Sequence, residues 1–118
     1  MSIPLPGSAV RGSKTGRPIM ALLDLLGRRT ALRVLWELSK SELKFRPLQA
    51  AAETSPGVLN TRLRELRQAE LVDAGPDGYR LTDRGRALAE LLLPLHGWSE
   101  EWAEHLGLGS RHGDSSAA

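Results

Sequence analysis

The chain of 118 residues contains no cysteine, which excludes disulfide bonds, thiol redox chemistry and cysteine-ligated zinc. It also lacks any apolar run near the roughly 20 residues that a membrane-spanning helix needs. The N-terminal segment, residues 1–17, lacks the continuous apolar centre of a secretory signal. These absences predict a cytoplasmic protein without a membrane partner.

The residue patterns of common enzymes and metal sites are missing as well. His96, His105 and His112 do not lie at helical ligand spacing from one another, and Glu101 with His105 forms only an i, i+4 pair typical of a surface contact. There is no glycine-rich nucleotide motif, and no nucleophile has an evident base beside it. We therefore expect neither enzymatic activity nor a metal or cofactor.

The charge that is present is unevenly distributed, although the formal net charge is only +2. Residues 11–33 contain six basic residues and one acidic residue, whereas residues 87–118 contain one basic and five acidic residues. A basic front and an acidic back suggest that one surface meets a polyanion while another faces away or meets protein.

A single domain is expected, because a chain of this length with 41% hydrophobic residues can form one modest core. Residues 1–17 combine Pro, Gly and Ser with basic residues and predict a flexible basic arm. Residues 107–118, rich in Gly and Ser, predict a disordered tail. The domain itself is expected to cover residues 18–106.

Helical periodicity recurs through this domain, and capping residues mark where each helix should begin or end. The first helix should begin at Pro18 and end at Gly27, and the second should be capped by Thr30. Further helices are expected at residues 46–52, from Pro56 to about residue 70 after a Ser55 cap, and after a Thr82 cap, the last one bent or divided by Pro94 and Gly97.

The helix after Ser55 is the most informative element. Leu59, Leu63 and Leu66 repeat at the spacing of one buried stripe, which leaves a polar face on the other side. Hydrogen-bonding side chains on such a face suit the base edges of a DNA major groove. The candidates for base contacts are Ser55, Gly57, Asn60, Thr61, Arg64 and Gln68.

Two short strands, 71–74 and 79–81, are expected around Gly75-Pro76-Asp77-Gly78, where the Asp-Gly pair favours a tight turn. Together with the two preceding helices, this hairpin predicts a mainly α fold with a small β-hairpin, a winged helix-turn-helix. Asp73 and Asp77 would repel a DNA backbone. Candidates for phosphate contacts are Arg28, Arg29, Arg62, Arg67, Arg80 and Arg84.

The last helix has more apolar surface than a small core can cover from one side. Dimerisation through the terminal helices would bury it, and two recognition helices one DNA turn apart would read a palindromic site. Alternatively, the tryptophans of this helix fold back onto the first helix of the same chain. The residues predicted for the dimer interface are Ile19, Leu22, Leu91, Leu95, Trp98 and Trp102.

The function predicted from these patterns is sequence-specific binding of double-stranded DNA by a homodimeric transcriptional regulator that acts by occupying its operator. A protein interaction module, in which the basic helix meets an acidic partner, is the alternative that the acidic hairpin favours. A small-molecule effector has no support in the sequence; the apolar space between the last helix and the domain body is the place for one.

The chain also resembles the HxlR-type transcriptional regulators, which are similar to the MarR regulators. The resemblance covers about residues 18–102. It implies a bacterial homodimer that binds operator DNA and pairs through its terminal helices. The sequence lacks the N-terminal cysteine and the longer basic hairpin of many members. The matching pieces are Leu25-Leu26-Gly27-Arg28-Arg29, Leu35-Trp36-Glu37-Leu38, Phe45 with Leu48, Ser55-Pro56, residues 58–66, Leu71-Val72, and residues 79–82 with Gly85 and Leu88.

Overall fold

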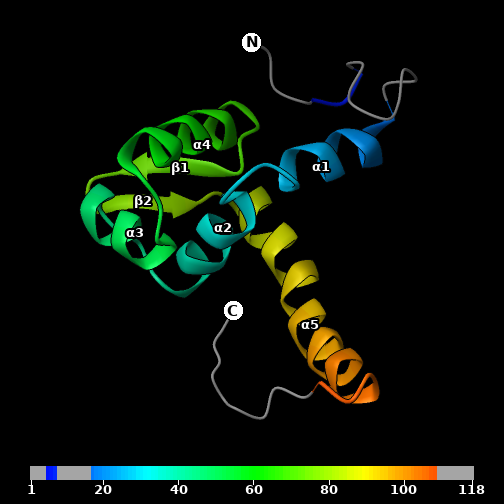
Figure 1. The fold of residues 1–118 in the computed structure, drawn as a ribbon. Coiled ribbons are helices and arrows are strands. Elements are labelled where there is room, and N and C mark those ends of the chain that lie inside the picture. The colour runs from blue at the N-terminus through cyan, green and yellow to red at the C-terminus, as the bar shows by residue number, and fades with distance from the viewer. Residues whose placement is uncertain (1–4, 8–16, 109–118) are drawn as a thin grey trace.

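The computed structural model describes residues 5–7 and 17–108, so most of the predicted arm and tail lies outside the described residues. The elements follow the predicted order (Figure 1). They are α1 (Pro18–Leu26), α2 (Ala31–Lys40), α3 (Phe45–Ala52), α4 (Pro56–Gln68), β1 (Val72–Gly75), β2 (Gly78–Leu81) and α5 (Asp83–His105). None of these helices is long and apolar enough to span a membrane.

The core lies where α2, α3 and α4 meet the hairpin. Its fully buried large side chains are Leu35, Leu48, Leu59, Leu66 and Val34. Each helix contributes the apolar positions that recur every three or four residues, which is why burial follows the leucine pattern of the sequence. In Figure 1, α5 extends away from this body after its first turns.

Two of the predicted helix caps are confirmed. The Ser55 hydroxyl accepts a hydrogen bond from the Val58 backbone N–H at 3.2 Å, at the start of α4. The Thr82 hydroxyl accepts from the Gly85 N–H at 3.0 Å, at the start of α5. Each cap satisfies one of the amides that a helix N-terminus leaves without a partner.

The predicted Thr30 cap is wrong. Thr30 stands at the N-cap position of α2, but its φ of 74° is left-handed and its side chain makes no cap hydrogen bond. Its hydroxyl instead donates to the Thr54 hydroxyl at 3.4 Å. The left-handed backbone turns the side chain away from the helix amides and towards the segment that precedes α4.

The last helix was predicted to be bent or divided by Pro94 and Gly97, and the division is not found. α5 runs without interruption from Asp83 to His105, with Pro94 inside it. Pro94 cannot donate a hydrogen bond to the carbonyl of Glu90. Both residues are exposed, so water can reach that carbonyl, and this makes the missing bond tolerable.

The hairpin is a two-stranded antiparallel sheet in which Val72 pairs with Leu81 and Asp73 with Arg80. Pro76 and Asp77 form its turn, inside the predicted segment Gly75-Pro76-Asp77-Gly78, and the strands begin and end within one residue of the predicted 71–74 and 79–81. Gly78 follows with a φ of 130°, and an added Cβ there would lie 2.6 Å from the Leu43 carbonyl carbon. Glycine is therefore required for both conformation and space.

Candidate nucleic-acid interface

α4 turns its leucine stripe inward and its polar face outward. Leu59, Leu63 and Leu66 are buried in the core, while Asn60, Arg64 and the last residue, Gln68, are exposed. The predicted base-contact residues Ser55 and Gly57 are exposed at the start of the helix, and Thr61 is half-buried. The helix therefore presents its hydrogen-bonding residues as one accessible face, at the edge of the body in Figure 1.

Arg64 and Arg67 are the unpaired cations of this helix. Both side chains are exposed, and neither makes a hydrogen bond or ion pair with another residue in the described part of the chain. They line a groove of about 530 Å³ between α4 and the hairpin. Its other lining residues are Asn60, Leu63, Gln68, Val72, Asp73 and Tyr79.

Arg28 and Arg62, which were predicted to contact phosphate, are instead engaged by a carboxylate of the protein itself. Both pair with Glu65 of α4: Arg28 Nη1 lies 2.7 Å from its Oε2, and Arg62 Nη1 lies 2.8 Å from its Oε1. The three side chains are 20%, 15% and 9% exposed, for Arg28, Arg62 and Glu65 respectively. Arg28 also lies 3.5 Å from Asp24. Arg28 therefore connects the turn after α1 to α4, and Arg62 completes the cluster from α4 itself.

The other cations predicted to contact phosphate fall into two groups. Arg29 and Arg84 are exposed and have no side-chain partner among residues 17–108. Arg80 is half-buried and lies 3.5 Å from Asp73 and 3.9 Å from Glu42. The positive charge of Arg80 is therefore partly balanced by two carboxylates of the protein.

The predicted dimer residues form an exposed apolar surface on α5 and α1. Leu91, Leu95, Trp98 and Trp102 are 53–75% exposed, and the two tryptophan rings lie 5.6 Å apart. These tryptophans therefore do not fold back onto α1, which was the alternative. Ile19 of α1 is exposed too, while Leu22 is half-buried against the core.

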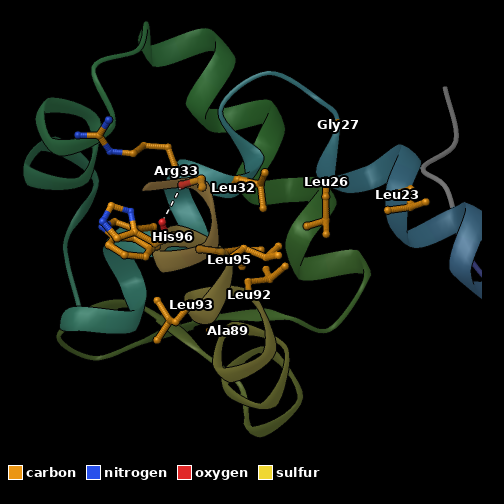
Figure 2. A pocket seen from close by; sticks show the side chains of 13 residues that line it. Leu23, Leu26, Gly27, Leu32, Arg33, Ala89, Leu92, Leu93, Leu95 and His96 are labelled. Atoms are coloured by element: carbon orange, nitrogen blue, oxygen red, sulfur yellow. Dashed lines mark hydrogen bonds between the residues drawn. The ribbon is translucent and has the colours of Figure 1, made fainter. Parts of the chain in front are cut away.

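An apolar groove of about 750 Å³ lies between α1, α2 and α5, in the space where the sequence placed any effector (Figure 2). Leucines such as Leu23, Leu32 and Leu92 make up most of its wall. Its polar members include Arg33, whose Nε donates to Glu37 at 2.9 Å, and His96, whose ring lies 5.6 Å from that of Trp36.

Three acidic residues of the site were missed by sequence reasoning. Glu65 has an i, i+3 relation to Arg62 that was visible in the sequence, but its partner Arg28 is 37 residues away. Asp73 was noted only as a repulsive charge, and Glu42 had no signal at all. The Arg28–Glu65 and Arg80–Glu42 contacts join distant segments, which helical periodicity does not reveal, and Asp73 with Arg80 is a cross-strand pair of the hairpin.

Comparison with known proteins agrees with this geometry. The model of the HxlR-like helix-turn-helix family matches residues 25–106. The chain belongs to the HxlR-like helix-turn-helix family. The HTH-type transcriptional regulator YvaP of Bacillus subtilis is 32% identical over 90 residues, which are 70% of this chain and 83% of YvaP.

Solved structures show the same architecture for this HxlR-like chain. Quinone-bound YodB from B. subtilis has a TM-score of 0.66 and 26% identity, over 70% of this chain and 96% of YodB. A winged helix-turn-helix DNA-binding domain, Mb0332 from Mycobacterium bovis, has a TM-score of 0.53 and 22% identity, over 74% of this chain and 90% of that one. The fold is therefore a winged helix-turn-helix, with α3 and α4 as its helix pair and β1–β2 as its wing.

Proposed function

We propose that this protein binds operator DNA as a homodimer, reads its sequence with α4, and regulates transcription in the cytoplasm by occupying the site. The observation that carries this proposal is the exposed polar face of α4, in which Asn60, Arg64 and Gln68 are accessible while the leucines are buried. Membership of a family of transcriptional regulators supports the same function.

The residue types on this face match the donor and acceptor pattern of the major groove. Arginine donates to guanine O6 and N7, and asparagine or glutamine pairs with adenine N6 and N7. We assign base contacts to Asn60, Arg64 and Gln68, with Ser55, Gly57 and Thr61 at the same surface. Arg67, Arg29 and Arg84 are the phosphate contacts, because their side chains are exposed and unpaired among the described residues.

Arg28 and Arg62 are left out of this assignment. Each would have to abandon Glu65, a mostly buried carboxylate, in order to reach a phosphate. An uncompensated buried charge costs more than one surface phosphate contact returns. Their task in the proposed complex is to fix the angle of α4 on the body.

The exposed apolar surface of α5 supports the homodimer. Replacing Trp98 and Trp102 together by aspartate should raise the dimer dissociation constant by at least about 100-fold, because each protomer loses two aromatic contacts. Sedimentation velocity over a concentration series measures this. Glu104→Ala, on another side of α5, is the control. A wild-type chain that stays monomeric at micromolar concentration would contradict the homodimer.

The first test of DNA binding is a gel-shift titration with the chain's own upstream region and a scrambled duplex, at two salt concentrations. Selective, salt-sensitive binding supports the regulator. Failure to bind either duplex at low salt supports the second candidate, a protein interaction module. The acidic residues Glu42, Asp73 and Asp77 around the wing are the observation that favours that candidate.

Arg64→Ala sharpens the test. We expect it to weaken binding to the preferred duplex by about 1 to 3 kcal/mol, with a smaller loss on the scrambled duplex, because a base contact is removed. Arg62→Ala is the matched control, because Arg62 lies on the same helix but pairs with Glu65. Assayed well below its unfolding temperature, it should keep the ratio of the two affinities. Equal losses on both duplexes for Arg64→Ala would exclude it from base reading.

A further inference from the structure

Arg80, the cation nearest the wing tip, is folded back onto the protein. It stands opposite Asp73 in the antiparallel register, with its Nη2 3.5 Å from the Asp73 Oδ2. A Cβ added to Gly75 would lie 2.9 Å from the Arg80 guanidinium carbon. The guanidinium therefore packs closely against the wing at Gly75.

A second carboxylate reaches Arg80 from the segment before α3. The Tyr79 N–H donates to the Leu43 carbonyl at 2.8 Å, and the Leu43 N–H donates to the Tyr79 carbonyl at 3.1 Å. This bridge continues the hairpin sideways by one residue pair. It brings Glu42, the neighbour of Leu43, to 3.9 Å from the Arg80 guanidinium.

Asp73 also lies beside the polar face of α4. It lines the groove between α4 and the wing together with Asn60, Arg64 and Arg67. On the wing side of this groove a phosphate meets the Asp73 carboxylate, whereas the free cations Arg64 and Arg67 lie on the α4 side. The wing carries Asp73 and Asp77 against Arg80, so its own charge is negative.

We propose that Asp73, with Glu42, acts as a specificity determinant by withholding Arg80 from the phosphates of non-operator DNA. This inference rests on the proposed function. Non-specific binding consists of phosphate contacts, so one withheld cation and one added carboxylate reduce it directly. Base contacts by α4 are untouched, and the ratio of operator to non-operator affinity rises.

Operator binding is affected less because its register is fixed. Docking of α4 on its bases allows a single register, whereas non-specific binding samples many, including those in which a released Arg80 reaches a phosphate. A non-specific complex has no fixed register and can use any available cation. The pairs that hold Arg80 are partly exposed and weak, and phosphate would displace them if Asp73 did not also repel it.

The test uses Asp73→Asn in the full chain, with the duplex preferred by the wild type and a scrambled duplex of equal length. Fluorescence anisotropy at several salt concentrations gives both affinities. We expect affinity for the scrambled duplex to rise about 3- to 10-fold, and its salt slope to steepen by about 0.9, the equivalent of one phosphate. Affinity for the preferred duplex should rise less.

Two further variants make the outcome decisive. Asp77→Asn removes the same charge from the wing without touching Arg80, and should leave the salt slope unchanged. Asp73→Asn with Arg80→Gln should return the slope to the wild-type value. The inference is overturned if Asp73→Asn raises both affinities equally or neither, if Asp77→Asn acts as strongly, or if the double variant keeps the steeper slope. A wild type that prefers no duplex would instead refute the proposed function.

Discussion

The two sides of α4 carry the same residue type in opposite circumstances. On the side that faces the groove, Arg64 and Arg67 are exposed, and among the described residues their side chains have no partner. On the side that faces the turn after α1, Arg62 is mostly buried and shares the Glu65 carboxylate with Arg28. One side is available to a polyanion, and the other holds the helix in place.

This difference shows that the neighbours of an arginine decide its role. A free guanidinium at the surface loses little when it exchanges water for phosphate. A guanidinium bound to a buried carboxylate must leave a charge behind if it moves. The free side of α4 should therefore be visible in DNA binding, and the paired side in stability.

The largest effect is expected when the paired side is broken at its centre. Glu65→Ala leaves Arg28 and Arg62 close together without their shared anion, and should lower the free energy of unfolding by about 3 kcal/mol. Urea unfolding followed by tryptophan fluorescence measures it. Glu90→Ala, an exposed glutamate of α5, is the control and should change it by less than about 0.5 kcal/mol. Equal effects for the two variants would mean that the Glu65 cluster does not hold α4.

The two sides can also be compared directly in stability. Arg62→Ala should cost about 1 to 2 kcal/mol, because it removes a charge-assisted hydrogen bond to a buried carboxylate. Arg64→Ala should stay within about 0.5 kcal/mol of the wild type, since its side chain is exposed. Thermal unfolding of the two variants measures the difference. A larger loss for Arg64 than for Arg62 would reverse the assignment of the two sides.

Loss of the N-terminal cap of α4, which supports both sides of the helix, should lower the free energy of unfolding by less. Ser55→Ala removes the hydroxyl that accepts from the Val58 amide, and should cost about 1 kcal/mol. Ser55→Asp, which retains an acceptor, should recover most of that loss. Unfolding in urea provides the measurement, and an alanine variant as stable as the wild type would show that this cap contributes nothing.

The smallest expected effect on stability is at Thr30, the residue before the first turn of α2. Thr30 has a β-branched side chain in a left-handed conformation, which is unfavourable for such residues. Thr30→Gly should raise the free energy of unfolding by about 0.5 kcal/mol, the relief of strain exceeding the added entropy of the unfolded chain. If the variant is instead less stable, the long hydrogen bond from Thr30 to Thr54 contributes more than its 3.4 Å length suggests.

The sequence was sufficient for those features that depend on near neighbours. The caps at Ser55 and Thr82 and the leucine stripe of α4 are local patterns, and the structure confirms them. The resemblance to HxlR-type regulators was sufficient for the family, which the family model confirms.

The features that sequence reasoning missed join distant segments. Arg28 and Glu65 are 37 residues apart, and Leu43 pairs with Tyr79 across the segment that contains α3 and α4. Neither contact has a periodic signature, and each changes the role of an arginine. The expected division of α5 is absent for another reason: proline in a helix interior removes a hydrogen bond, but solvent around Pro94 makes the loss tolerable there.

The most direct test of the central claim, that the free side of α4 reads bases, is selection of binding sites from random duplexes with the wild type and with Arg64→Ala. The wild type should select an inverted repeat whose half-site centres lie about 10 base pairs apart, or a multiple of that distance. Arg64→Ala should lose discrimination at one position in each half-site and keep it at the others. An unchanged motif in the variant, or no motif in the wild type, would contradict the account.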